Sequence, residues 1–129
     1  MLRRSLLAVL ILAPTAALAE GAEKKKGGGL DFIQIQTLTA TVSRRDGRNG
    51  VLTVETGVDV PDHALHTRAE ASIPRLRAAY AQVLMTYAAG LPGGTPPNPE
   101  YLSREFQRQT DLVLGKPGAK LLLGTILIN

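Results

Sequence analysis

The stretch from Ile73 to Gly90 constrains the fold most, because its apolar residues follow the period of an α-helix. Positions 73, 76, 80, 83, 84 and 87 are apolar, and their spacing places them on one face of a helix. Gly90 stands where such a helix would end. A helix with one apolar face needs a sheet or a second helix to cover it, so the rest of the chain must supply that cover.

The amino terminus has the pattern of a secretory signal peptide, which we place at residues 1–19. Arg3 and Arg4 precede the apolar run Leu6–Leu18, and a small-residue tripeptide ends at Ala19. The run is shorter than the ~20 residues that a helix needs to cross a bilayer. We therefore predict export to the periplasm with cleavage after Ala19, through either the general or the twin-arginine route. The alternative is an uncleaved segment that anchors the protein in the inner membrane.

The mature chain is nearly balanced in charge. Without residues 1–19, 13 Lys and Arg face 11 Asp and Glu, which argues against a nucleic-acid partner. Cysteine is absent, so disulfides, thiolate metal sites and thiol catalysis are excluded. Residues 20–29 read as a flexible, charged and glycine-rich linker whose Lys24, Lys25 and Lys26 can make weak contact with a membrane surface. Residues 30–129 then form a single domain.

Two β-rich runs follow the linker and predict an antiparallel hairpin. Residues 31–45 alternate between apolar and polar but change phase midway, which indicates a bulge near Gln36 and Thr37. Residues 52–60 alternate without interruption as far as Pro61. Between the two runs, residues 44–50 contain Asp-Gly and Asn-Gly pairs that suit a tight turn.

Helical patterns occupy the middle of the chain. Residues 61–72 extend the apolar stripe backwards, and Pro74 predicts either one kinked helix or two helices with Ser72 capping the second. After a Pro- and Gly-rich loop, Asn98 caps a second long helix that Gly115 ends. We expect this helix to bury the face listed here: Leu102, Phe106, Gln109 and Val113.

The carboxy-terminal run from Leu121 to Ile128 is apolar at almost every position. This pattern predicts a strand that is buried on both faces or pairs centrally in a sheet. The order of elements gives an α+β fold class: a small, mainly antiparallel sheet (the hairpin plus the carboxy-terminal strand) with two to three helices packed on one face.

The sequence shows no pattern typical of an enzyme, and we expect no cofactor. His63 and His66 lie three residues apart, so they are weak candidates for a metal site, but no further histidine is available to complete it. The arginines at positions 44, 45 and 48 belong to the turn of the hairpin, where they suit solvent, an acidic partner or lipid head groups. No partner-binding residue can be assigned from the sequence.

Residues 30–129 resemble the periplasmic domain of the flagellar basal body-associated FliL family. The run Ile73-Pro-Arg-Leu-Arg77 is similar to the "P-x-[IL]-R" start of a helix in that family. The other matching segments, in order, are a strand at 32–42, a strand at 51–60 of the "L-x-V-x-x-x-V-x-V" kind, a helix near Tyr101-Leu102 and an apolar strand at 121–129. Members usually also carry a full transmembrane helix near the amino terminus, where this chain has only Leu6–Leu18.

The resemblance implies a core like that of stomatin and prohibitin and a non-catalytic role beside the stator units of the flagellar motor. We therefore expect an exported protein-interaction domain that associates with motor components or with itself. The alternative is a periplasmic protein that binds a small molecule or lipid between helices and sheet. Four side chains at helical spacing would line that pocket: Tyr80, Tyr87, Leu102 and Phe106.

Overall fold

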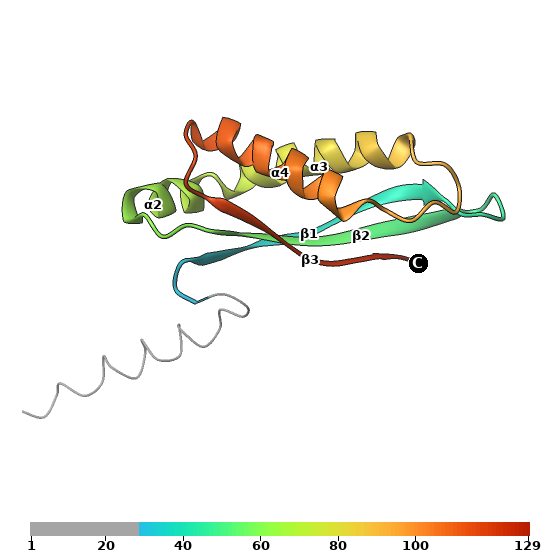
Figure 1. The fold of residues 1–129 in the computed structure, drawn as a ribbon, viewed down its shortest axis with the longest axis horizontal. Helices are drawn as coiled ribbons and strands as arrows, with labels where there is room; N and C mark the ends of the chain where they lie inside the picture. Colours follow the sequence, from blue (N-terminus) through green and yellow to red (C-terminus); the bar gives the residue numbers. More distant parts are fainter. Residues whose placement is uncertain (1–28) are drawn as a thin grey trace, which may run out of the picture.

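The computed structural model describes residues 29–129, so the predicted signal peptide and the predicted linker up to residue 28 lie outside the described residues. The described chain is an α+β fold in which three helices lie on one face of a three-stranded antiparallel sheet (Figure 1). The predicted fold class and order of elements are confirmed. In chain order the elements are β1 (Phe32–Ser43), β2 (Asn49–Asp59), α2 (His63–Ala71), α3 (Ile73–Ala89), α4 (Pro99–Leu114) and β3 (Lys120–Ile128).

Strands β1 and β2 form the predicted hairpin, and β2 lies in the centre of the sheet. Their register shifts between Ile35 and Leu38, which confirms the predicted bulge. On β1, apolar residues on both sides of the bulge then face the helices and are buried, whereas the residues between them are exposed. In the turn, Gly47 has a φ of 86° and the Asp46 carboxylate accepts a hydrogen bond from the backbone N–H of Arg48 (3.0 Å).

Helices α2 and α3 are separate helices that meet at Ser72. Asp62 caps α2, because its side chain accepts from the backbone N–H of Leu65 (2.9 Å). Ser72 ends α2 and precedes α3, and Pro74 occupies the first turn of α3. The Ser72 hydroxyl accepts from the guanidinium of Arg75 (3.0 Å) and makes no capping bond to the backbone of α3.

Helix α4 begins and ends as predicted but buries a slightly different face. The side chain of Asn98 accepts from the backbone N–H of Tyr101 (3.1 Å), and Gly115 ends the helix with a φ of 85°. The buried residues are Leu102, Phe106, Thr110 and Leu114. Gln109 and Val113, which the sequence placed on the buried face, are only half-buried, so that part of the prediction was wrong. Steps of four residues keep these side chains in one row on the helix. Thr110 is tolerated in this buried row because its hydroxyl forms hydrogen bonds with Tyr80 and with the carbonyl of Phe106.

One apolar core joins the helices to the inner face of the sheet. Tyr80 of α3 and Phe106 of α4 lie at its centre with ring centroids 5.1 Å apart, and both are fully buried. Leu84 of α3 and Leu52 and Val54 of β2 are also fully buried in this cluster. No helix within residues 29–129 is long and apolar enough to span a membrane.

The prediction for the carboxy-terminal strand was wrong in its placement. Strand β3 pairs with β2 alone and forms an edge of the described sheet. Leu121 is its only buried residue, while Leu127 and Ile128 are 40% and 37% exposed. Continuous apolarity is typical of a strand covered on both faces. In this protein the same pattern belongs to an edge strand whose side chains are mostly exposed or half-buried.

Candidate functional site

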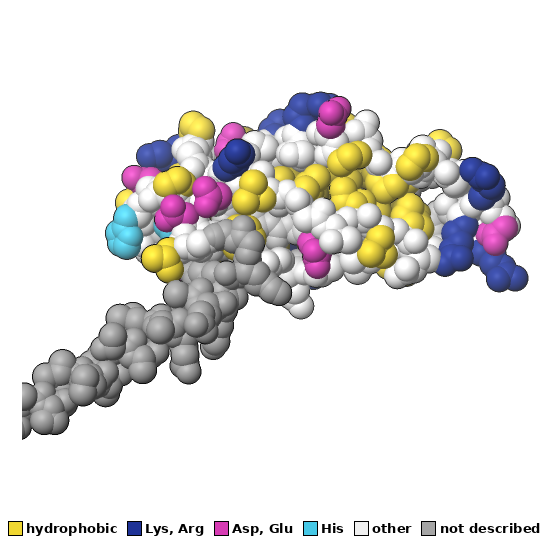
Figure 2. Space-filling view, turned by 60° about the horizontal axis from the view of Figure 1, so that its bottom comes forward, with side chains coloured by type: hydrophobic (Ala, Val, Ile, Leu, Met, Phe, Trp, Pro, Cys, Tyr) yellow, Lys and Arg dark blue, Asp and Glu magenta, His cyan; other side chains and the backbone are white. Residues whose placement is uncertain are grey.

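The exposed apolar margin of β3 is the least expected surface of the described chain. From Leu121 to Ile128 the strand contains no charged residue and no proline, although edge strands usually carry such residues to prevent pairing with other chains. Figure 2 shows hydrophobic side chains gathered on this side of the molecule, next to the basic side chains of the hairpin end. An apolar edge of this kind suits contact with another polypeptide.

At the Leu121 end of β3 the outward-pointing backbone groups have hydrogen-bond partners within the described chain, and towards Ile128 they have none. Gln107 of α4 closes the first end, because its amide accepts from the backbone N–H of Leu121 and donates to the carbonyl of Ala119 (both 2.8 Å). At the other end Asn129 exchanges both backbone hydrogen bonds with Val51 of β2 (3.0 and 3.1 Å).

Residues that bond the neighbouring strand alternate with residues whose N–H and C=O point away from it. Asn129 bonds β2, so the backbone groups of Ile128, and by the same alternation those of Ile126, point outward. Leu121 donates outward to Gln107, so Leu123 also points outward. We call residues 123–128 the open edge.

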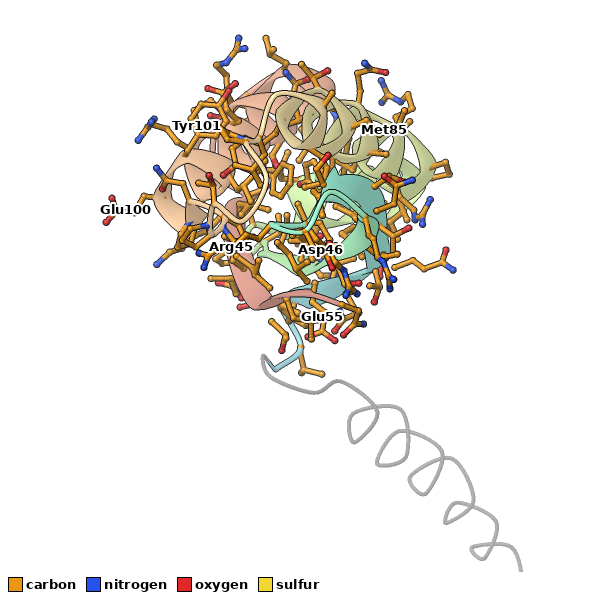
Figure 3. All side chains as sticks on the ribbon, turned by 90° about the vertical axis from the view of Figure 1, so that its right-hand side faces the viewer. Arg45, Asp46, Glu55, Met85, Glu100 and Tyr101 are labelled. Carbon is orange, nitrogen blue, oxygen red and sulfur yellow. The ribbon has the colours of Figure 1, made fainter. Side chains whose placement is uncertain are left out.

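A bulge interrupts the open edge at its middle. The pairing of β2 and β3 shifts between Val54 and Thr56, opposite Gly124 and Thr125. The Glu55 carboxylate accepts from the backbone N–H of Thr125 (3.3 Å), which satisfies the residue that the bulge leaves without a strand partner. Glu55 lies on the side of the sheet away from the helices, as Figure 3 shows. Gly124 within an apolar run was the signal in the sequence for this bulge.

Cations lie at the hairpin end of the open edge. A Cβ atom added at Gly50 would lie 2.8 Å from the carbonyl oxygen of Asn129 and 3.0 Å from Nε of Arg44, so the Arg44 guanidinium lies beside the end of β3. Arg45 extends on the β3 side of the hairpin tip (Figure 3). Both residues and Arg48 are exposed, and Asp46 is the only carboxylate in the turn.

Helix α4 and the first two residues of β3 line a groove. The groove has a volume of about 760 Å³, and Lys120 and Leu121 are its lining residues from β3. The lining residues from α4 are Glu100, Ser103, Arg104, Gln107, Arg108 and Asp111. Of the two arginines, Arg108 lies 3.3 Å from the Glu105 carboxylate, so its charge is partly balanced within the helix.

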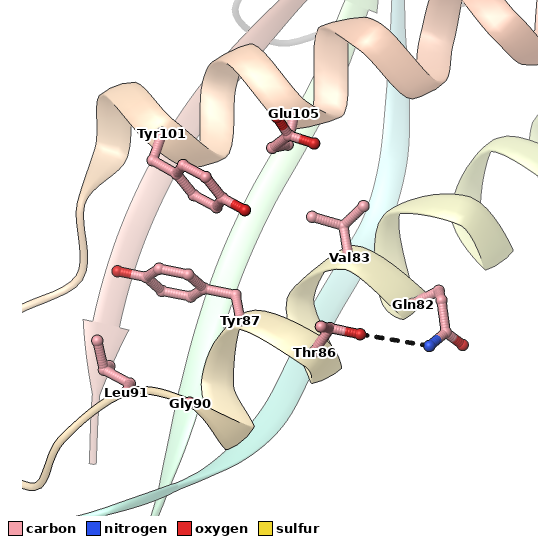
Figure 4. A pocket seen from close by; sticks show the side chains of 8 residues that line it. All are labelled: Gln82, Val83, Thr86, Tyr87, Gly90, Leu91, Tyr101 and Glu105. Carbon is pink, nitrogen blue, oxygen red and sulfur yellow. Dashed lines mark hydrogen bonds between the residues drawn. The ribbon is translucent and has the colours of Figure 1, made fainter.

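A second surface lies between α3 and α4 near the interhelix loop. Tyr87 and Tyr101 stack there with ring centroids 5.4 Å apart, and Figure 4 shows them facing one another across the groove. The backbone N–H of Asn98 donates to the Tyr87 hydroxyl (2.8 Å), and the Arg104 guanidinium lies 5.8 Å from the centre of the Tyr101 ring. The groove has a volume of about 420 Å³, with Glu105 at its rim.

The side chains proposed from the sequence as the lining of a small-molecule pocket do not line a common pocket. Tyr80, Leu102 and Phe106 are fully buried in the core, and only Tyr87 lines a groove. Burial raises the pKa of Tyr80 to about 12. The core aromatics therefore stabilise the fold and do not face a cavity.

The two histidines lie on α2, away from the open edge. His63 is exposed, and His66 is half-buried with Nδ1 3.1 Å from the carbonyl oxygen of Val60 and Nε2 3.5 Å from a carboxylate oxygen of Glu70. Both ring nitrogens of His66 thus have neighbours within the protein. Among residues 29–129, no three His, Cys, Asp or Glu residues are grouped closely enough to hold a metal ion. Lys24, Lys25 and Lys26 lie outside the described residues.

Comparison of the chain with protein-family models, with curated proteins and with solved structures gave no significant match.

Proposed function

We propose that the protein is an exported, non-catalytic protein-interaction domain whose partner binds along β3. The observation that carries the proposal is the open edge, an uncharged apolar strand margin with outward-pointing backbone groups. Such margins are avoided in proteins that stay monomeric, unless another chain uses them. The absence of any enzyme-like sequence pattern adds support from a separate source.

The resemblance of residues 30–129 to FliL suggests that the proposed interaction takes part in flagellar motility. A FliL-like domain in the periplasm would contact stator components of the flagellar motor, either as one copy or as an oligomer. The signal-peptide pattern at residues 1–19 supports export, with an uncleaved anchor as the alternative. Mass spectrometry of a periplasmic extract tests export: a mature chain that begins at Glu20 supports cleavage, and an intact chain held in membranes supports the anchor.

Photo-crosslinking in the bacterial host tests the proposed interaction. A photoreactive amino acid placed at Ile128 is expected to crosslink to a motor component, whereas the same group at the exposed Ala78 of α3 is not. Deletion of the gene should reduce swimming in soft agar, and the wild-type gene should restore it. Normal swimming of the deletion strain, together with no protein crosslinked from Ile128, would contradict the proposal.

A second candidate function is binding of a small molecule or lipid in the groove of Tyr87 and Tyr101. Its volume of about 420 Å³ falls within the usual range of ligand pockets, and the stacked rings provide an apolar surface with polar atoms at the rim. Native mass spectrometry of protein purified from its host tests this function. A bound compound that is lost in Tyr101→Ala favours it, and a ligand-free wild-type protein counts against it.

A further inference from the structure

We infer that the open edge receives an extended segment of the partner as a fourth strand, and that this segment carries carboxylates where it meets the hairpin. The inference rests on the proposed function and adds to it the conformation and the charge of the partner. It depends on three features of the described chain: the direction of the backbone groups of β3, the row of half-covered apolar side chains beside them, and the cations at one end.

The backbone of the open edge is available for strand pairing. The N–H and C=O groups of Leu123, Ile126 and Ile128 point away from β2, and no backbone hydrogen bond from a loop or turn within residues 29–129 reaches them. The side chain of Gln107 already bonds the carbonyl of Ala119 and the N–H of Leu121. An added strand would therefore pair with residues 123–128 and would not extend to Leu121.

The side chains of the open edge provide an apolar surface that an added strand would cover. Ile126 and Leu123 face the helix layer and are half-buried, and Ile128 on the same face is 37% exposed. On the opposite face Leu127 is 40% exposed. Because side chains alternate along a strand, a segment with small or β-branched apolar residues would cover both rows.

The charge at the hairpin end selects an acidic segment. Arg44 lies beside Asn129, Arg45 extends on the β3 side, and Arg48 completes the turn, against the single carboxylate of Asp46. No ion pair joins any of these arginines to a carboxylate of the described chain. A partner carboxylate at this position would gain favourable contacts, and a partner cation would be repelled.

A second copy of the chain fits this edge less well. In an antiparallel pair of β3 strands, Lys120 of each copy would approach Arg44 and Arg45 of the other. In a parallel pair Lys120 would lie beside Lys120. Both arrangements place like charges together at the ends of the paired strands, which disfavours self-association.

The other edge of the sheet differs from the open edge in ways that prevent docking. The exposed residues of β1 are polar, the strand carries its own bulge, and the Arg77 guanidinium donates to the carbonyl of Thr37 at that bulge (3.1 Å). Thr41 on β1 is exposed. The backbone N–H of Arg44 bonds the carbonyl of Arg48, and hydrogen-bonded and non-hydrogen-bonded pairs alternate along β1 from that pair, so the N–H of Thr41 points away from β2. Thr41 is therefore a matched control position.

A peptide-binding experiment with the full chain tests the inference. The probe is a synthetic peptide of alternating valine and threonine with two glutamates at each end, labelled for fluorescence anisotropy. The control peptide has lysines in place of the glutamates. Ile128→Pro removes an outward N–H and leaves the bonds to β2 intact, whereas Thr41→Pro makes the same change on the opposite edge.

We expect the acidic peptide to bind saturably, with affinity at least about tenfold weaker for Ile128→Pro and within about twofold of wild type for Thr41→Pro. The lysine-ended peptide should bind about tenfold more weakly at low salt, and the difference should shrink as salt is added. No binding, equal binding by Ile128→Pro, or equal binding of the two peptides would overturn the inference. A wild-type dimer that dissociates in Ile128→Pro would also overturn it, in favour of a second copy.

The outcomes separate this inference from the proposed function. A crosslink from Ile128 to a motor component without peptide binding would leave the protein-interaction role standing and reject the extended acidic strand. Peptide binding without a crosslink in the host would support the strand-pairing edge and count against the motor partner.

Discussion

At the scale of single residues, Tyr80 and Thr110 form a polar pair within the apolar core. The Thr110 hydroxyl donates to the backbone carbonyl of Phe106 (2.7 Å), so the Tyr80 hydroxyl is the donor to Thr110. Both side chains are fully buried. Each hydroxyl proton therefore has an acceptor, which is the condition under which polar groups are tolerated in a core.

Removal of the acceptor should destabilise the fold more than removal of the donor. Thr110→Val leaves the buried Tyr80 hydroxyl without a partner, which costs about 1–3 kcal/mol. Tyr80→Phe leaves Thr110 bonded to Phe106 and removes one hydrogen bond, which costs about 0.5–1.5 kcal/mol. Urea unfolding of both variants and of the double variant measures the difference. The double variant should lose less than the sum of the two, and a larger loss for Tyr80→Phe would contradict the assigned direction.

The raised pKa of Tyr80 predicts alkaline instability. Above pH 10 a tyrosine in the unfolded chain loses its proton, whereas Tyr80 in the folded protein keeps its proton up to about pH 12. The unfolded state therefore binds fewer protons, and the free energy of unfolding falls by up to about 1.4 kcal/mol per pH unit between pH 10 and 12. This contribution is fully present below pH 10.

Denaturation midpoints measured between pH 9 and 12 test the alkaline prediction. Tyr80→Phe should reduce the slope by the contribution of one group. Tyr101→Phe retains Tyr80 and should keep the wild-type slope. An identical slope for Tyr80→Phe and wild type would show that Tyr80 does not titrate in this range.

At the scale of elements, the contact between α4 and β3 decides how much of the sheet margin is closed. Gln107 reaches from the helix to Ala119 and Leu121 and replaces the strand that would otherwise bond them. It also donates to the Asp111 carboxylate (3.0 Å). The helix thus fixes one end of β3 through a single side chain.

Gln107→Leu should loosen the start of β3. The change leaves the N–H of Leu121 and the carbonyl of Ala119 without their partner, and we expect a loss of about 1–3 kcal/mol in the free energy of unfolding. Hydrogen exchange at Leu121 should become faster. Gln109→Leu, the same change at a half-buried position of the same helix, should cost less than about 0.5 kcal/mol. Equal losses in the two variants would contradict the role of Gln107.

The elements differ in how well their sequences predict them. The phase change of β1 predicted its bulge, because alternation is a local property that a register shift must disturb. Asn98 and Gly115 predicted the ends of α4 for a similar reason. The position of β3 in the sheet was not predictable from its own residues. An apolar sequence indicates that a strand is favoured away from water, but it does not indicate whether a strand, a helix or another chain covers it.

At the scale of the whole molecule, the candidate site is less predictable than the fold. The arginines of the hairpin tip were recognisable as exposed charges, but the proximity of Arg44 to Asn129 depends on the pairing of segments about 80 residues apart. The start of the open edge likewise depends on Gln107, because its side chain bonds Ala119 and Leu121, and its sequence position gives no sign of this contact. Long-range pairing, and not local pattern, positions the surface.

Helix α3 connects both layers of the molecule, so damage to its buried face should destabilise all elements together. Leu84 is fully buried in the single core that contains residues of all three strands and all three helices, whereas its neighbour Met85 is 54% exposed. We expect Leu84→Ala to lower the free energy of unfolding by about 2–5 kcal/mol, and Met85→Ala to change it by less than about 0.5 kcal/mol. Far-ultraviolet circular dichroism and tyrosine fluorescence should give one coincident urea transition for the wild type and for Leu84→Ala. If the sheet and the helices unfolded at different urea concentrations, the core would not be one cooperative unit, and the open edge could then lose its strand geometry while the helices stayed folded.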